Sequence, residues 1–178
     1  MKMKNLNDLF VHEIKDIYSA EKQLLRALPR LAQVVTSPEL RQALEDHFHE
    51  TQTQVERLET IMSELGISAR VPKCAAMEGL IEEGKSLLVV EMGPCVLDAA
   101  IIAACQRVEH YEIAAYGCAR TFADMLGLTE MAKTLQQTLD EERNADKKLT
   151  SIAMSHINQE AKGDSDLAFA GKEHAHHK

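Results

Sequence analysis

The stretch RVEHYEIAAYG, residues 107–117, lies within a long segment whose apolar residues recur with helical spacing. It places Glu109 and Glu112 three residues apart, and this spacing puts both carboxylates on one face of a helix. The apolar neighbours Val108 and Ile113 indicate that the helix is at least partly buried. Because buried carboxylates are unfavourable without a compensating charge, the sequence predicts a cationic partner for this pair.

Similar periodic segments surround this stretch and predict four long helices and one short helix. Ser37 followed by Pro38 is typical of a helix start, and Thr129 is expected to cap the last helix. Gly66 and Gly127 are expected to end the second and third long helices. The expected helices span residues 6–34, 38–65, a short helix within 74–90, 96–125 and 129–157.

The lengths of the connections predict how these helices are arranged. Short turns after the first and third long helices make each pair antiparallel, whereas the connector at residues 66–95 can travel the length of a bundle. The expected fold is therefore all-α: a four-helix bundle of two antiparallel hairpins, joined by a long crossover that contains a short helix. Residues 1–157 are expected to form this bundle, and residues 158–178 a polar, mobile tail.

Composition and charge restrict the classes of function. A chain of 178 residues suffices for one compact domain, and its net charge of -8 disfavours nucleic-acid binding. No apolar run approaches the ~18 residues of a membrane span, and no secretory signal is recognisable. We therefore expect a cytoplasmic protein with no nucleic-acid or membrane partner, in which the four cysteines stay reduced.

Glutamates on the other long helices are expected to lie at the same level along the bundle as Glu109 and Glu112. Glu21 and Glu50 are 29 residues apart across the first turn, and Glu112 and Glu142 are 30 apart across the second. Residues equally far from a turn lie at one level of an antiparallel pair, about 20 Å from the turn in each hairpin. If the hairpins pack face to face, four helices contribute acids to a single layer.

Several carboxylates in a bundle core cannot all be ionised without counter-charge, which two divalent or trivalent metal ions would supply. Oxygen ligands suit iron, manganese or magnesium better than copper. The alternative is that these glutamates are ordinary solvated residues of helices. Asp146 and His47 are additional candidate ligands, and Gln54, Tyr18 and Tyr111 are candidates for hydrogen bonds to the ligands.

Four blocks of the sequence resemble the bacterial YciF/YciE family of the ferritin-like superfamily. They are DIYSAEKQLLRALPRLA, AMEGLIEEG, DAAIIAACQRVEHYEIAAYG and TLDEERNADKKLT, in this order along residues 5–155. The resemblance implies a ferritin-like bundle, a homodimer, a rubrerythrin-like two-metal centre and an association with bacterial stress responses. The metal ligands that it implies are Glu21, Glu50, Glu109, Glu112 and Glu142.

The chain departs from the superfamily at two positions. Three residues after the glutamates of the second and fourth long helices, where the superfamily usually has histidine, this sequence has Thr53 and Ala145. The expected site is therefore almost entirely oxygen, unless His47 turns inward. We expect two metal ions, iron or manganese first, with magnesium or zinc as alternatives.

The leading hypothesis is a stress protein with a two-metal centre in its bundle. If that centre is redox-active, its open coordination positions would bind oxygen or peroxide, and an oxidoreductase or peroxidase-like activity would follow. The main alternative is a dimeric structural or interaction protein with a non-catalytic metal site, which the missing histidines favour. Iron storage ranks lower, because the chain ends in a polar tail rather than in a further short helix.

Overall fold

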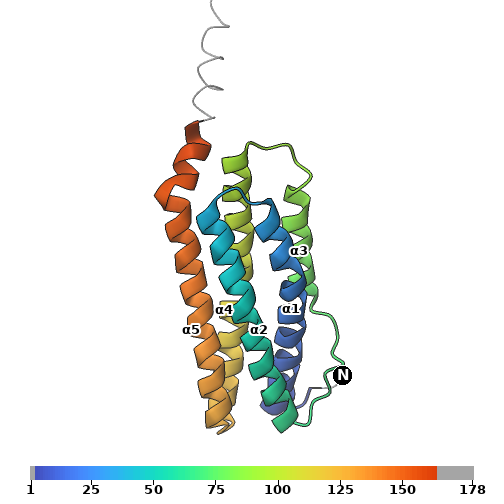
Figure 1. Cartoon of the computed structure of the whole chain (residues 1–178). Coiled ribbons are helices and arrows are strands. Elements are labelled where there is room, and N and C mark those ends of the chain that lie inside the picture. The colour runs from blue at the N-terminus through green and yellow to red at the C-terminus, as the bar shows by residue number, and fades with distance from the viewer. Residues whose placement is uncertain (1–2, 164–178) are drawn as a thin grey trace, which may run out of the picture.

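The computed structural model describes residues 3–163, which are helical apart from the connecting loops and contain no strand. Figure 1 shows the helices standing side by side in one bundle. None of the described helices is sufficiently long and apolar to cross a membrane. The elements are α1 (Leu6–Val34), α2 (Pro38–Glu64), α3 (Ala75–Leu87), α4 (Pro94–Met125), α5 (Thr129–Ile152) and a π-helical turn, η1 (Ala153–Ile157).

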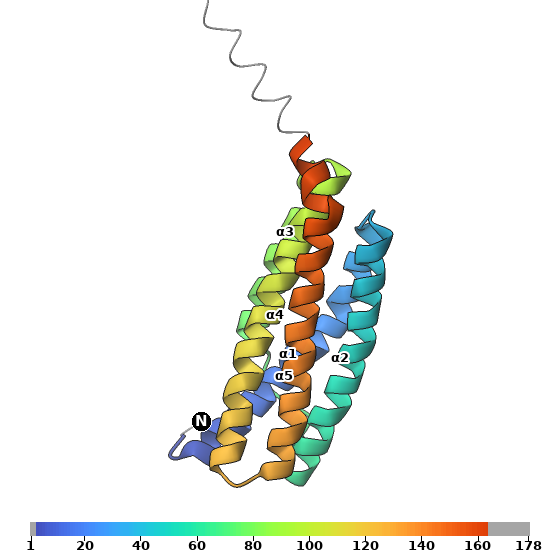
Figure 2. The ribbon, with the colours of Figure 1, turned by 90° about the vertical axis from the view of Figure 1, so that its left-hand side faces the viewer.

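The predicted architecture is confirmed. α1 and α2 form one antiparallel hairpin, α4 and α5 form the other, and α1 packs on α4 while α2 packs on α5. The crossover between the hairpins contains α3, which lies outside the four long helices against α1 and α4 (Figures 1 and 2). The fold is thus the expected four-helix bundle, with a fifth, short helix covering one of its edges.

Most of the predicted helix ends are correct. The Ser37 side chain accepts a hydrogen bond from a backbone N–H of α2, and Pro38 begins that helix. Gly66 and Gly127 have φ values of 65° and 74°, the left-handed conformation that glycine adopts without strain. The prediction for Thr129 was wrong: the N-cap position is Leu128, no side chain caps the helix, and Thr129 is its first residue.

At the carboxyl end, the chain stays helical beyond the expected boundary at residue 157. The π-helical turn η1 follows α5, and residues 158–163 continue as helix. The first six residues of the predicted tail are therefore helical. Residues 164–178 lie outside the described part of the chain.

Two apolar clusters fill the bundle, one toward the α1–α2 turn and one toward the α4–α5 turn. Large side chains from all four long helices pack in them, including Leu28, Leu44 and Ile101 in the first and Ile14, Leu58 and Leu135 in the second. Along each long helix, buried polar residues separate the two clusters. We call these residues the polar layer: Glu21, His47, Gln54, Glu109, Glu112 and Glu142.

Asp98 of α4 holds the turn of the first hairpin in place. This buried carboxylate accepts hydrogen bonds from the Thr36 backbone N–H at 2.9 Å, the Thr36 hydroxyl at 2.7 Å and the Ser37 backbone N–H at 2.8 Å. We expect Asp98→Ala to lower the free energy of unfolding by about 2 kcal/mol, because it leaves these donors without a partner. Urea unfolding measures the loss, and Asp124→Ala, at an exposed residue, should change it by less than about 0.5 kcal/mol. An equal effect of both substitutions would contradict this role.

Candidate metal centre

The polar layer brings acidic side chains from three of the four long helices together with a histidine from the fourth. Glu21 comes from α1, His47 from α2, Glu109 and Glu112 from α4, and Glu142 from α5. The four glutamates are at most 2% exposed and His47 is 7% exposed. One ligand atom from each of His47, Glu109, Glu112 and Glu142 can be chosen so that all four lie within 4.8 Å of one another. This spacing is compatible with ligands of a shared metal site.

The layer lacks hydrogen-bond partners for many of its polar atoms. Nine buried side-chain nitrogen and oxygen atoms of the described residues have no hydrogen-bond partner, and eight of them belong to the polar layer. They include both carboxylate oxygens of Glu112 and both ring nitrogens of His47. Buried polar groups are normally hydrogen-bonded, so the concentration of unpaired atoms in one layer distinguishes it from the rest of the interior. These oxygen and nitrogen atoms are of the kinds that could coordinate a cation.

Neighbouring side chains hold some of these carboxylates in fixed orientations. The Tyr116 hydroxyl donates to Glu21 Oε1 at 2.5 Å, and the Gln54 amide donates to Glu142 Oε1 at 2.5 Å. In both glutamates the second oxygen remains without a partner. The hydrogen bonds thus fix each carboxylate and leave one oxygen free to coordinate, which is how residues around a metal commonly orient its ligands.

An ion pair next to the layer helps to hold the Gln54 side chain in place. Arg57 of α2 makes two hydrogen bonds to the Glu141 carboxylate of α5, at 2.6 and 2.9 Å. The same carboxylate accepts from Gln54 Nε2 at 3.2 Å. This bidentate pair ties α2 to α5 beside Glu142, so it fixes the side of the layer where those two helices meet.

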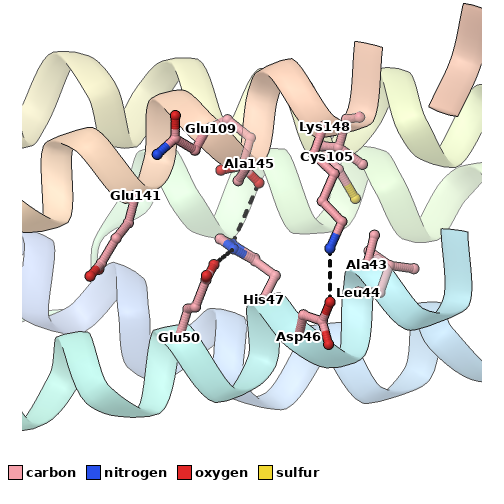
Figure 3. A pocket seen from close by; sticks show the side chains of 12 residues that line it. Ala43, Leu44, Asp46, His47, Glu50, Cys105, Glu109, Glu141, Ala145 and Lys148 are labelled. Atoms are coloured by element: carbon pink, nitrogen blue, oxygen red, sulfur yellow. Dashed lines mark hydrogen bonds and ion pairs between the residues drawn. The ribbon is translucent and has the colours of Figure 1, made fainter. Parts of the chain in front are cut away.

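His47 lies between two carboxylates without bonding to either. Its Nε2 is 3.5 Å from Glu109 Oε1 and its Nδ1 is 3.7 Å from Glu50 Oε2 (Figure 3). Neither contact meets the geometry of a hydrogen bond, so both ring nitrogens are available to other partners. The sequence did not decide whether His47 faces the interior. In the structure it does, and its imidazole adds a nitrogen donor to the carboxylate oxygens of the layer.

Burial dominates the electrostatics of the layer. Burial and neighbouring carboxylates raise the pKa of Glu21 to about 8, and burial raises the pKa of Glu109 to about 8 as well. The same causes raise the pKa values of Glu112 and Glu142 well above the ordinary value. Burial by itself lowers the pKa of His47, but the surrounding carboxylates outweigh it and the pKa is raised. Without a cation, the acids of this layer resist ionisation at neutral pH.

A small cleft leads from the surface to the layer. It has a volume of about 100 Å³, lies between α2 and α5, and reaches His47 and Glu109 (Figure 3). An ion pair between Lys148 and Asp46, at 2.8 Å, lies along it. Glu50 is also in its wall. A metal ion or a small molecule of a few atoms fits this cleft, whereas a large organic substrate does not.

Several residues singled out in the sequence lie outside the group of four. The Glu50 side chain is half exposed at the cleft and faces His47 rather than the other acids. Asp146 accepts a hydrogen bond from Gln106 at 3.0 Å. The expected hydrogen bonds from Tyr18 and Tyr111 to the ligands are absent from the described structure, because Tyr18 donates to Glu59 at 2.9 Å and Tyr111 donates to Asp16 at 2.6 Å.

The tyrosine that does bond to a carboxylate of the layer is Tyr116, which the sequence reasoning missed. It lies four residues after Glu112 and therefore shares its helix face, a spacing that could have identified it. Tyr111 directly precedes Glu112 and so projects about 100° away from it, toward α1 and the start of α3. For finding the tyrosine that bonds to an acid of the layer, position on the helix face was therefore a better guide than proximity in sequence.

Comparisons with known proteins agree on fold and kinship. The sequence profile described as Domain of unknown function (DUF892) matches residues 5–162. Protein YciF of Escherichia coli strain K12 is 46% identical over 162 residues, which are 90% of this chain and 98% of that protein. The crystal structure of the E. coli stress protein YciF matches with a TM-score of 0.84, covering 88% of this chain and 99% of that one.

Two further solved structures are similar. YcfI from Rhodopseudomonas palustris, for which a structural role has been suggested, is 39% identical with a TM-score of 0.82, over 86% of this chain and 98% of that one. A Xanthomonas campestris protein is 21% identical with a TM-score of 0.65, over 95% and 99% of the two chains. The latter similarity concerns the fold alone.

Proposed function

The chain belongs to the DUF892 family and is a close relative of the stress protein YciF. From this premise, we propose that it is a stress protein with a carboxylate-rich two-metal centre in its polar layer. The observation that carries this proposal is the set of eight unpaired buried polar atoms in one layer. Glu21, His47, Glu109, Glu112 and Glu142 would hold the ions.

Charge balance favours two ions rather than one. The four glutamates of the layer carry four negative charges when ionised, and two divalent cations carry four positive charges. With this balance His47 is neutral, the form in which an imidazole nitrogen binds a metal. A single divalent ion would compensate only two of these charges, so the other two glutamates would have to stay protonated and would be poorer ligands.

The donor chemistry favours iron or manganese. Carboxylate oxygens suit magnesium and manganese, and an imidazole nitrogen suits iron and zinc, so a mixed set with one nitrogen fits iron or manganese best. Copper prefers nitrogen and sulfur donors, and the thiol of Cys105, which lies beside Glu109 in the cleft, is buried with its pKa raised to about 12 by that burial. Zinc and magnesium are the alternatives, and elemental analysis distinguishes them from iron and manganese.

The surroundings of the layer suit a small oxidant as substrate. A bound iron or manganese pair would supply redox equivalents and open coordination positions for oxygen or peroxide. The chain itself contributes the two apolar clusters that keep bulk water from the layer. It also contributes a cleft of about 100 Å³ as a route for small molecules, and the Gln54 and Tyr116 hydrogen bonds that orient the carboxylates.

Elemental analysis of the full-length protein, purified without a chelating resin, tests the proposal directly. We expect close to two iron or manganese ions per chain, and consumption of peroxide or oxygen by the reduced, loaded protein. As a control, protein stripped with a chelator should contain no metal and should consume neither peroxide nor oxygen. A protein that neither retains nor takes up iron or manganese would overturn the metal centre.

A second candidate function is a dimeric structural or interaction protein. It is favoured by the raised pKa values of the four acids, since protonated carboxylates need no metal, and by the role suggested for the R. palustris relative. Sedimentation of metal-loaded and metal-free protein separates the two functions. A homodimer of unchanged size and stability in both states would favour the structural role, provided that the loaded protein consumes no oxidant.

A further inference from the structure

An apolar cavity lies on the other side of the bundle, beneath the crossover helix α3. It has a volume of about 130 Å³ and is formed mainly by α1, α3 and α4, which pack against one another (Figures 1 and 2), with His47 of α2 reaching it from within the bundle. Its walls are mostly aliphatic. They include Leu24 and Leu28 of α1, Leu80 and Ile81 of α3, and Val108 of α4.

The two ends of this cavity differ in polarity. At the inner end lie His47 and Glu109, which are buried and carry polar atoms without hydrogen-bond partners. At the outer end lie Arg30 and Lys85, which are exposed. The cavity therefore runs from a cationic mouth on the surface to the edge of the polar layer.

The mouth is more cationic than the overall charge of -8 suggests. A shallow depression next to it shares Arg30 and Lys85 and adds Arg26, Lys73, Glu78 and Glu82. The two lysines pair with the two glutamates. Arg26 and Arg30 make no hydrogen bond or ion pair with any described residue, so two positive charges remain for an anion.

We propose that this cavity binds a small amphipathic anion, an organic acid with an apolar body of about six carbons. An apolar cavity of about 150 Å³ holds one benzene molecule, so a six-carbon body is of the right size. The carboxylate lies at the mouth, where Arg30 attracts it, while the apolar body fills the space between α1, α3 and α4. The opposite orientation would bury the carboxylate at the inner end, away from water and from Arg30, which is costly for a charged group. Binding of the anion depends on the cavity and on the arginine at its mouth. It requires no metal and is therefore independent of the proposed metal centre.

The test uses hexanoate as probe, titrated into the full chain while methyl signals are followed by NMR. We expect saturable shifts for methyl groups that line the cavity, such as those of Leu28, Ile81 and Val108. Methyl groups of Leu58 and Leu135, in the other half of the bundle, should not move. The uncharged analogue 1-hexanol should bind at least about threefold more weakly, because it cannot pair with an arginine.

Two glycines of α3 provide a matched pair of variants. Gly84 lines the cavity, and a Cβ added there would meet only Ala104 Cβ at an ordinary 3.8 Å. Gly79 is exposed on the same helix, with nothing within 4 Å. Gly84→Leu should weaken hexanoate binding at least about tenfold by filling the space, whereas Gly79→Leu should leave it unchanged. Ala27→Leu, on the opposite wall, checks the result with a change in another helix.

A second pair of variants tests the mouth. Arg30→Gln should weaken hexanoate binding about threefold to tenfold and leave 1-hexanol binding unchanged, while Arg70→Gln, in the loop before α3, should affect neither. The proposal would be overturned if hexanoate produced no saturable shifts at millimolar concentration. It would equally be overturned if hexanol bound as well as hexanoate, or if Gly84→Leu and Gly79→Leu behaved alike.

Discussion

The substitution Glu112→Leu is expected to make the metal-free protein more stable while abolishing metal binding at the proposed two-metal centre. Glu112 is 1% exposed, and neither of its carboxylate oxygens has a hydrogen-bond partner. A leucine of similar volume removes an unpaired polar group from the interior. Replacing buried ion pairs by apolar residues of similar volume is often neutral or stabilises a protein by about 1–4 kcal/mol, and we expect a gain at the lower end of this range for the single unpaired carboxyl group of Glu112.

The expected loss of metal follows from the same geometry. Glu112 offers two unpaired oxygens to the group that includes His47, Glu109 and Glu142, so its removal takes two donor atoms from the site. We expect the Glu112→Leu protein to retain less than about one tenth of the metal of the native protein after dialysis, since the loss of a ligand typically weakens binding by orders of magnitude.

Urea unfolding of metal-free protein and elemental analysis of loaded protein measure the two effects. The matched control is Glu56→Leu, at an exposed position of α2, which should leave the metal content unchanged and alter stability by less than about 0.5 kcal/mol. A metal-free Glu112→Leu protein less stable than the native one would show that the carboxylate makes stabilising contacts within the protein. An unchanged metal content would exclude Glu112 from the site.

The second large effect expected is a loss of stability of the metal-free protein as pH rises. In the unfolded chain, the four glutamates of the polar layer ionise near the ordinary pKa of 4.5, whereas in the folded protein Glu21 and Glu109 ionise only at about 8. Between these values the folded state binds more protons than the unfolded state. The free energy of unfolding therefore falls as pH rises from about 5 to about 8, by about 1.4 kcal/mol per pH unit for each proton that the folded state keeps.

His47 acts in the same direction. Its pKa is raised in the folded state, so the stability that its charged form contributes is present at low pH and is lost as pH rises through that value. With all contributions combined, we expect the metal-free protein to lose several kcal/mol over this range. Metal binding should oppose the loss, because the ions replace the protons on the ligands.

Urea unfolding of chelator-treated protein at several pH values between about 5 and about 8 tests this dependence. The Glu112→Leu protein serves as the matched comparison and should show a shallower slope, since one of the titrating acids is gone. Metal-loaded native protein should gain stability relative to the metal-free form as pH rises. Stability of the metal-free protein that increased with pH over this range would contradict burial as the dominant effect on these acids.

Local sequence signals predicted the helices and their order closely. The expected first helix, residues 6–34, coincides with α1, and the Ser37–Pro38 start and the Gly66 and Gly127 ends are as expected. These signals work because helix starts and ends depend on backbone conformation and hydrogen bonds within a few residues. The prediction that Thr129 caps the last helix was wrong because the connection between α4 and α5 is only three residues long. The helix therefore begins at Thr129 itself, with Leu128 in the cap position.

The composition of the polar layer was predicted only in part. Distance from the turn correctly placed Glu21, Glu112 and Glu142 at one level, because the rise per residue of a helix is constant. It did not decide between Glu50 and His47, which lie at nearly the same height on α2. These two residues differ by about 60° around the helix axis, and the packing of α2 turns His47 inward and leaves Glu50 half exposed.

The number of long helices, their pairing and the level at which the acids lie could be predicted from the sequence alone, whereas the helix at the carboxyl end runs past its predicted boundary. The tertiary structure decided which face of each helix points inward, and thereby selected His47, Gln54 and Tyr116 as neighbours of the acids. It also decided that α3 packs over α1 and α4 and encloses a cavity with a cationic mouth. Helix periodicity is a property of neighbouring residues, whereas the rotation of a helix about its axis is fixed by side chains that meet from distant parts of the chain.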